Sequence, residues 1–147
     1  MSNGCEGLQS YLDLTTFSIG DACCGINILK VQEINKLTRV TRVPLAPEYV
    51  KGILNLRGRI ITVMDLGKRL GLPSLRETSH QRNIIVSFEN ESIGLLVDSV
   101  GEVIRTGRGN IEKPPANVVG IQGQYFEGVL KTEKQLISIL NLAAVLG

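Results

Sequence analysis

The sequence predicts an all-β protein in which two small β-barrels, accompanied by a few short helices, pack side by side. Ile, Val and Leu dominate its apolar residues, aromatic residues make up only 4%, and 16 of the 147 residues are glycine. This composition favours short strands joined by tight turns. A chain of this length buries roughly 68–70% of the surface that its unfolded form exposes, which suffices for one domain or two small ones. Disorder is excluded, because 43% of the residues are hydrophobic and the formal net charge is only +2.

Turn-forming residues divide the first half of the chain into two predicted hairpins and a short helix. The expected elements are a hairpin of residues 11–19 and 23–28, a segment at 29–40 whose spacing fits helix and strand alike, a hairpin of residues 53–56 and 60–64, and a helix at 65–71. Gly20 and Asp21 supply the first turn. Asp65 suits the N-cap of the helix and Gly71 suits its end. Pro47 interrupts the chain before the second hairpin and is suited to start one helical turn.

The second half repeats this order after a linker rich in Ser, Thr and charged residues. The expected elements are the linker at 73–81, a hairpin of residues 84–88 and 93–97, a loop at 110–118, a pair of strands at 129–130 and 136–140, and a helical turn at 141–146. The loop contains Pro114 and Pro115, which cannot donate the backbone hydrogen bonds of a sheet.

The two halves resemble two copies of one β-rich unit. Six residues recur unchanged 76 positions later: Gly52, Leu54, Ile61, Leu66, Leu70 and Gly71. At an offset of 69, residues 17–34 resemble residues 86–103, and one longer loop in the second half absorbs the difference of seven. Each copy is too small to be more than marginally stable alone. We therefore predict one domain across residues 1–147, with a first barrel in 11–75 and a second in 82–147. Whether the terminal strands are exchanged between the barrels is not visible in the sequence.

Cysteine and histidine usage argues against disulfides and metal sites. Cys5, Cys23 and Cys24 form an odd count without a Cys-x-x-Cys motif, and His80 is the single histidine. The interpretation is a cytosolic protein with reduced thiols, in which Cys23 or Cys24 is a small core residue. No apolar run is long enough to cross a membrane, and no secretion signal is visible.

Known catalytic motifs are also missing. Gly-x-Ser-x-Gly, a phosphate-binding glycine loop and His-Glu-x-x-His do not occur, so we expect no catalytic residues and no cofactor. A nucleic-acid-binding tandem barrel stays open as an alternative, since small barrels bind single strands. However, three Phe and three Tyr scattered along the chain form no stacking platform. Nine Lys and Arg against six acidic residues in 1–73, and seven against eight in the remainder, give only weak electrostatic steering.

Positions that differ between the two copies are the candidates for function. The tip of the second hairpin reads Asn-Leu-Arg-Gly-Arg at 55–59, whereas the equivalent tip at 131–135 reads Lys-Thr-Glu-Lys-Gln. Arg57 at this tip is either a solvated turn cation or a five-donor fork for a protein partner. Val31, between polar neighbours, is either part of a mixed strand or an exposed edge that accepts another strand.

Two segments carry a resemblance to a known family. Residues 25–34 read Gly-Ile-Asn-Ile-Leu-Lys-Val-Gln-Glu-Ile, and residues 43–66 contain Val-Lys-Gly followed by Asn-Leu-Arg-Gly. This pattern closely resembles the CheW family of bacterial chemotaxis coupling proteins, from Tyr11 to the last residue. Cys24, where the family often has an aromatic residue, and Thr62, where it often has proline, depart from the pattern. Both lie on expected strands.

The resemblance implies a non-enzymatic adaptor made of two SH3-like five-stranded β-barrels. In the family, the adaptor links the regulatory domain of the CheA histidine kinase to the cytoplasmic tips of methyl-accepting chemoreceptors, in arrays at the inner membrane. The residues implied in receptor binding are Arg57, Asn55 and Gly52, and those implied in kinase binding are Val31, Gln32 and Glu33. Gly52 and Glu33 recur in the second copy, so a structural role suits them equally. The resemblance also leaves open another output, such as pilus-based motility. It implies neither nucleic-acid binding nor direct membrane insertion.

Overall fold

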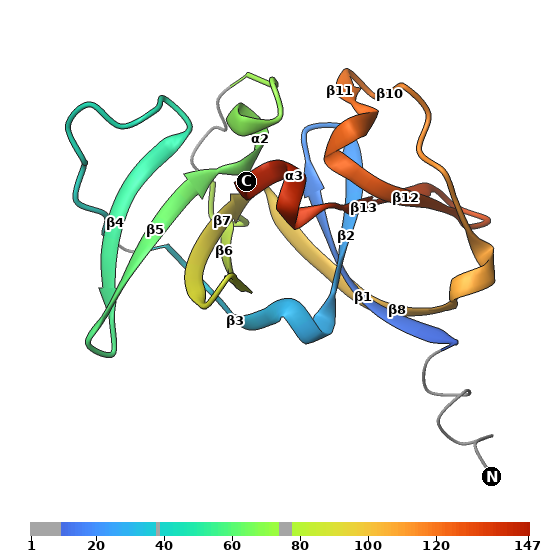
Figure 1. The fold of residues 1–147 in the computed structure, drawn as a ribbon, viewed down its shortest axis with the longest axis horizontal. Helices are drawn as coiled ribbons and strands as arrows, with labels where there is room; N and C mark the ends of the chain where they lie inside the picture. Colours follow the sequence, from blue (N-terminus) through green and yellow to red (C-terminus); the bar gives the residue numbers. More distant parts are fainter. Residues whose placement is uncertain (1–9, 38, 74–77) are drawn as a thin grey trace, which may run out of the picture.

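The computed structural model of the protein describes residues 10–37, 39–73 and 78–147. In it, the first barrel is built on a five-stranded sheet. Its strands, in spatial order, are β3 (Val31–Asn35), β6 (Arg82–Phe88), β7 (Glu91–Val97), β5 (Arg59–Asp65) and β4 (Val50–Leu56). Neighbouring strands are antiparallel except β5 and β7, which are parallel. A single bridge between Thr41 and Ile53 adds the incoming chain to β4. The strands β3 and β4 therefore form the two edges of this sheet (Figure 1).

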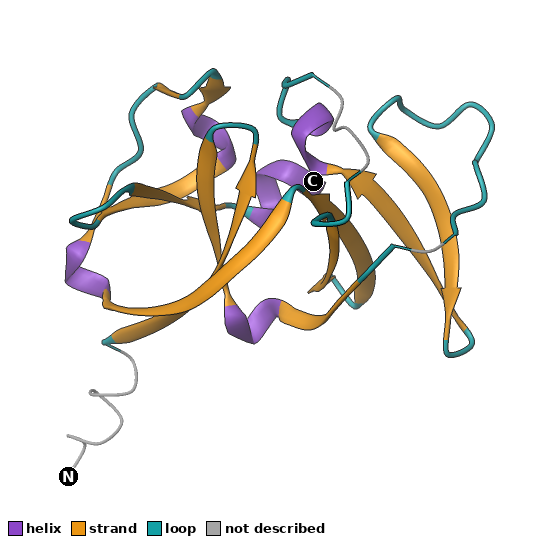
Figure 2. Cartoon of the chain, turned by 180° about the vertical axis from the view of Figure 1, so that it is seen from behind, coloured by secondary structure: helices purple, strands orange, loops and turns teal. Residues whose placement is uncertain are grey.

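The second barrel is built on a six-stranded sheet with the same plan. Its strands, in spatial order, are β8 (Ser99–Gly107), β1 (Tyr11–Ile19), β2 (Ala22–Asn27), β13 (Leu136–Leu140), β12 (Phe126–Lys131) and β9 (Ile111–Glu112). The single parallel pair of this sheet is β2 with β13. A small separate hairpin joins β10 (Asn117–Val118) to β11 (Ile121–Gln122). The predicted all-β architecture of two barrels side by side is confirmed (Figure 2).

Short helices join the strands. They are the 3-10 turns η1 (Ile28–Lys30), η2 (Arg108–Asn110) and η3 (Gly123–Tyr125) and the α-helices α2 (Leu66–Arg69) and α3 (Leu142–Leu146). The carboxylate of Asp65 accepts a hydrogen bond from the Lys68 amide, and Gly71 follows the helix at φ +90°, so the predicted cap and end are confirmed. The segment at 29–40, whose spacing fits helix and strand alike, contains the end of η1 followed by β3.

Two local expectations do not hold. Residues 47–50 form an isolated turn closed by the Val50 amide on the Pro47 carbonyl, and no helix starts there. The expected loop at 110–118 contains β9, because Ile111 and Glu112 pair with β12 before the two prolines end the strand. The predicted linker at 73–81 falls partly outside the described residues.

The two barrels exchange their first hairpins. The hairpin β1–β2, from the start of the chain, pairs with β8 and β13 of the second half. The hairpin β6–β7, from the second half, completes the sheet of β3, β4 and β5. Each barrel therefore draws strands from both sequence copies, and the division at 11–75 and 82–147 does not describe the barrels. The exchange places equivalent elements in equivalent positions: β3 matches β8, β5 matches β13, and α2 matches α3.

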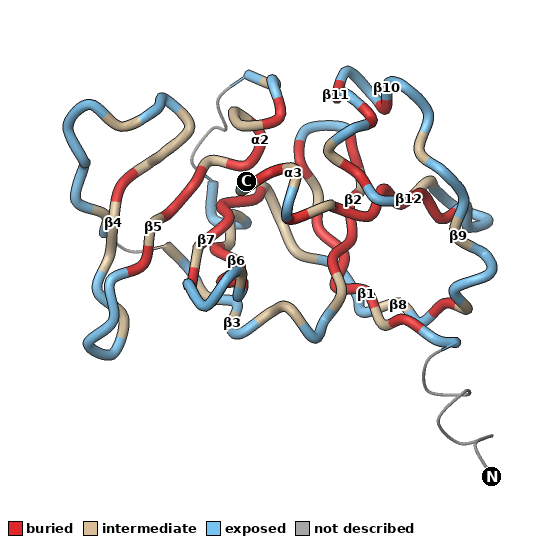
Figure 3. The backbone as a smooth tube through the Cα atoms, viewed as in Figure 1, coloured by how far each residue is buried: buried red, intermediate tan, exposed pale blue. Residues whose placement is uncertain are grey.

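The hydrophobic core runs without interruption across the contact between the barrels. One cluster of buried residues combines Phe17 and Ile26 of the second barrel with Ile84 and Leu95 of the first, and it includes both α-helices. Figure 3 shows the buried backbone gathered in these strands and in the helices between them. Cys24 is fully buried in this cluster, and burial raises the pKa of its thiol to about 12. Cys24 is therefore a core residue, as the sequence predicted for one of the two adjacent cysteines.

Arg69 joins the helices of the two barrels. From α2 its Nε donates to the Val145 carbonyl at 2.9 Å and its guanidinium donates to the Tyr125 hydroxyl at 3.1 Å. Its guanidinium carbon also lies 5.1 Å from the ring centre of Tyr49 and 5.3 Å from that of Tyr125. The positive charge thus stacks between two aromatic rings and satisfies carbonyls at the end of α3.

We expect Arg69→Met to lower the free energy of unfolding by about 2–4 kcal/mol, because it removes charged hydrogen bonds and both ring contacts. Chemical denaturation followed by circular dichroism measures this loss. Arg69→Lys keeps the charge but lacks the planar guanidinium group. Its free energy of unfolding should lie between those of wild type and Arg69→Met. Equal stability of wild type and Arg69→Met would contradict the role of this side chain.

Candidate functional site: a surface on β3 and the β4–β5 hairpin

The tip of the β4–β5 hairpin holds Arg57 in an exposed position. Leu56 pairs with Arg59, so Arg57 and Gly58 form a two-residue turn, with φ values of +53° and +81°. Positive φ at both positions is typical of the turns that match the twist of a hairpin. The Asn55 side chain accepts a hydrogen bond from the Gly58 amide at 3.0 Å and so fixes this turn. The Arg57 side chain is 75% exposed.

The structure brings Arg57 together with Glu33, although the two residues belong to different predicted sites. An Nη atom of Arg57 lies 2.5 Å from Oε1 of Glu33 on β3. The other carboxylate oxygen of Glu33 accepts a hydrogen bond from the Asn35 side chain at 2.8 Å. The hydrogen bond from Asn35, and next the one from Arg57, lower the pKa of Glu33. Arg57, which the resemblance implies in receptor binding, and Glu33, which it implies in kinase binding, are therefore parts of one surface.

A second set of polar contacts continues this surface. Ser92 on β7 donates to the Gln32 side chain at 2.8 Å and accepts from Arg59 at 2.6 Å. Gln32, Glu33, Arg57 and Arg59 all line a shallow cavity of about 190 Å³ between β3 and the hairpin. We call these four residues, together with Leu56, Ile61 and Ile85 of the same cavity and the exposed side chains of β3, the β3–hairpin surface.

The two apolar residues of β3 differ in orientation. Val31 is half-buried and packs against the shared core, which fits the first of its two interpretations, a residue of a mixed strand. Ile34, 39% exposed, takes that position on this edge strand. Just before β3, Leu29 of η1 is 87% exposed. Sequence reasoning missed Leu29, although an apolar pair at the connection between the two barrels was a usable signal.

Gly52 serves the backbone. A Cβ atom at this position would lie 2.5 Å from the carbonyl oxygen of Thr41, which crosses β4 here, and its φ is +154°. A Cβ atom at the equivalent Gly128 in β12 would meet the Ile111 side chain and would lie 3.1 Å from the Glu112 carbonyl oxygen, both of β9. The conserved geometry of the two copies thus requires glycine at both positions.

Within the described parts of the chain, no cluster of three or more His, Cys, Asp or Glu residues could hold a metal ion. In the same parts, no helix is long and apolar enough to cross a membrane. What the β3–hairpin surface offers is an ion pair, exposed amides and exposed apolar side chains at a sheet edge. These are the features of a protein-binding scaffold.

Comparison with known proteins identifies the family. The CheW-like domain model matches residues 13–147. The chain is 32% identical to the chemotaxis protein CheW of Treponema pallidum, over 91% of this chain and 81% of that protein. It is 33% identical to the chemotaxis protein CheW of Bacillus subtilis, over 90% of this chain and 85% of that protein. The crystal structure of the scaffolding protein TtCheW from Thermoanaerobacter tengcongensis superposes with a TM-score of 0.85 at 37% identity, covering 92% of this chain and 88% of that one.

The chain belongs to the CheW-like domain family and is a non-enzymatic adaptor of chemotaxis signalling. The resemblance found in the sequence is confirmed, and the nucleic-acid-binding alternative is not favoured.

We expect Gly52→Ala to destabilise the protein by about 2–4 kcal/mol, because the new methyl group meets the Thr41 carbonyl, which is held by a hydrogen bond from the Ile53 amide. Thermal unfolding measures the loss. Gly58→Ala is the matched control, since its φ is also positive but no atom lies within 4 Å of the added Cβ. If the two variants unfold at the same temperature, the close approach to Thr41 does not explain Gly52.

We expect the Glu33 carboxyl to titrate below the ordinary range of glutamate. Since its folded-state pKa is lowered, its contacts stabilise the protein at pH values above the pKa of glutamate in the unfolded chain. That contribution is lost as the pH falls through the folded-state pKa. An NMR titration of the side-chain carboxyl measures the pKa, which should rise in Arg57→Ala and in Asn35→Ala. An unchanged pKa in both variants would show that neither contact persists in solution.

Proposed function

We propose that this protein connects the regulatory domain of a CheA-type kinase to the cytoplasmic tips of methyl-accepting chemoreceptors, within arrays at the inner membrane. Family membership supports the adaptor role. The observation that carries the assignment to a site is the ion pair between Arg57 and Glu33. It joins one residue implied for each partner, Arg57 for the receptor and Glu33 for the kinase.

The receptor tip binds at the hairpin side of this surface. Because Arg57 is largely exposed, the remaining N–H donors of its guanidinium face solvent and suit acidic or carbonyl groups on a helical tip. Leu29 and Ile28 of η1 lie at the connection between the barrels and supply apolar area for a helix. Asn55 and Gly52 act indirectly here, by holding the hairpin in shape.

The kinase domain pairs along the free edge of β3. This strand ends its sheet, and Gln32 and Ile34 point away from the core. An edge strand with one exposed apolar side chain suits another small barrel, because main-chain hydrogen bonds add affinity and side chains add specificity. Glu33 then lies between the two partners, and a receptor that draws Arg57 away changes the charge facing the kinase.

We expect Arg57→Ala to weaken binding of a soluble receptor-tip fragment by about 2 kcal/mol, roughly thirty-fold in Kd, with the fold intact. Ile34→Lys should weaken binding to the kinase regulatory domain and leave the receptor affinity near wild type. Titration calorimetry with each purified partner measures both. Lys134→Ala is the control. It removes a positive charge from the equivalent hairpin tip of the second barrel, so it shows the effect of losing a charge elsewhere.

The two variants also separate the alternatives. A folded Arg57→Ala protein with unchanged receptor affinity would remove the receptor from this surface. If Ile34→Lys lowers receptor affinity alone, the whole β3–hairpin surface belongs to the receptor and the kinase binds elsewhere.

A further inference from the structure

A larger cavity lies at the opposite end of the molecule from the β3–hairpin surface. It has a volume of about 710 Å³ and lies between the β1–β2 turn, the end of α2 and the start of β8. In Figure 1 the β1–β2 turn, α2 and the β10–β11 hairpin lie at the top, whereas η1 and the β4–β5 turn lie at the bottom. A ligand in this cavity, which we call the inter-barrel cavity, would leave the β3–hairpin surface free.

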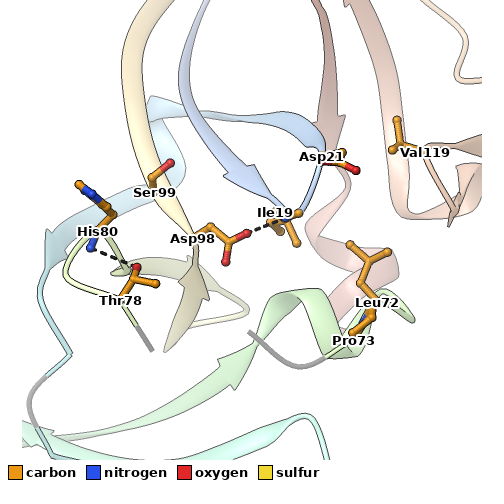
Figure 4. Close-up of a pocket in the computed structure, with 10 residues that line it drawn as sticks. Ile19, Asp21, Leu72, Pro73, Thr78, His80, Asp98, Ser99 and Val119 are labelled. Atoms are coloured by element: carbon orange, nitrogen blue, oxygen red, sulfur yellow. Dashed lines mark hydrogen bonds between the residues drawn. The ribbon is translucent and has the colours of Figure 1, made fainter. Parts of the chain in front are cut away.

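The walls of the inter-barrel cavity are mainly apolar. Ile19 is fully buried beneath it, and Leu72, Pro73 and Val119 line its sides. Figure 4 shows Leu72 pointing into the space between Ile19 and Val119. The volume lies within the range of 300–1,000 Å³ that is typical of ligand pockets, so one or two bulky side chains can enter.

Two carboxylates and one imidazole, that of His80, are the titratable groups among the described lining residues. Asp98 at the start of β8 and Asp21 in the β1–β2 turn both line it, and none of the described lining residues is Lys or Arg. The Asp98 carboxylate accepts a hydrogen bond from the Gly20 amide at 2.6 Å, which holds it at the edge of the cavity (Figure 4). An apolar space beside two carboxylates complements an apolar group that carries a neighbouring positive charge.

Val119 adds an independent observation. It is 54% exposed and has a φ of +48°, in the two-residue turn between β10 and β11. At such a position Asn or Gly is strongly preferred, and a β-branched residue is rare. Its exposed side chain does not contribute to either core cluster, so folding does not account for it. Strained residues of this kind gather at binding sites.

We propose that the inter-barrel cavity binds a peptide segment of a partner protein in which a large apolar side chain stands beside Lys or Arg. The apolar side chain enters between Ile19, Leu72 and Val119, and the cation pairs with Asp98. The inter-barrel cavity is separate from the β3–hairpin surface. The proposal does not depend on which partner binds the β3–hairpin surface.

The experiment selects peptides from a displayed dodecapeptide library on the purified full-length protein and measures their Kd by fluorescence anisotropy. We expect the enriched peptides to combine Leu, Ile, Phe or Trp with an adjacent Lys or Arg. Asp98→Asn keeps the acceptor for the Gly20 amide but removes the charge, and it should weaken binding at least about five-fold.

Val119→Asn separates binding from folding. It relieves the unfavourable turn conformation, so the denaturation midpoint should rise while peptide affinity falls. Val103→Asn is the matched control, because Val103 is also 54% exposed but lies on β8 away from the cavity. It should leave peptide affinity unchanged.

Three kinds of result would overturn the proposal. One is binding that does not use the proposed contacts, shown by enriched peptides without basic residues or by peptides that bind Asp98→Asn and Val119→Asn as tightly as wild type. Another is tight binding of phenethylammonium without enrichment of any peptide, which would indicate a site for small amines. The third is loss of receptor-tip affinity in Asp98→Asn, which would make the cavity part of the receptor surface. The Arg57→Ala experiment is independent of all three.

Discussion

The exchange of hairpins between the two sequence copies is the constraint on which the rest of the structure depends. Neither sheet can close until β1–β2 has joined the second half of the chain and β6–β7 has joined the first. The barrels therefore share one core, and they cannot separate without breaking the pairing of β2 with β13 and of β5 with β7. Units of about 70 residues, marginal alone, gain their stability from this shared burial. The result is a rigid body with fixed distances between its surfaces.

Rigidity matters for an adaptor, because partners held by one molecule are positioned by it. Two segments of the chain pass from one barrel to the other and so create the exchange. They are η1 with β3, which follow β2, and β8, which follows β7. Both segments also reach the surface between the barrels. Arg69 reinforces the same contact from α2 to α3. The elements that hold the barrels together are thus the elements that border the β3–hairpin surface and the inter-barrel cavity.

Local features were predictable from the sequence, and non-local ones were not. The hairpins, the Asp65 cap and the burial of one of the two adjacent cysteines follow from short-range patterns. These patterns are clear in residues 11–28 and 65–71. The exchange is invisible to such patterns, because a hairpin has the same alternation whichever barrel it joins. The proximity of Arg57 and Glu33 likewise depends on barrel closure, which brings together residues 24 positions apart. The sequence alone therefore gives no sign that Glu33, which the resemblance implies in kinase binding, lies beside Arg57.

The internal repeat explains why the β3–hairpin surface occurs once in a molecule whose two halves share one plan. The positions equivalent to Arg57 and Glu33 in the second copy are Glu133 and Glu102, at offsets of 76 and 69. Two carboxylates repel each other and cannot form the ion pair. The second barrel therefore keeps the scaffold, including Gly128 in place of Gly52, but its ion pair beside the hairpin joins Lys131 to Glu112 instead. Both halves thus build the same scaffold, and only the first carries an arginine at the tip of its second hairpin.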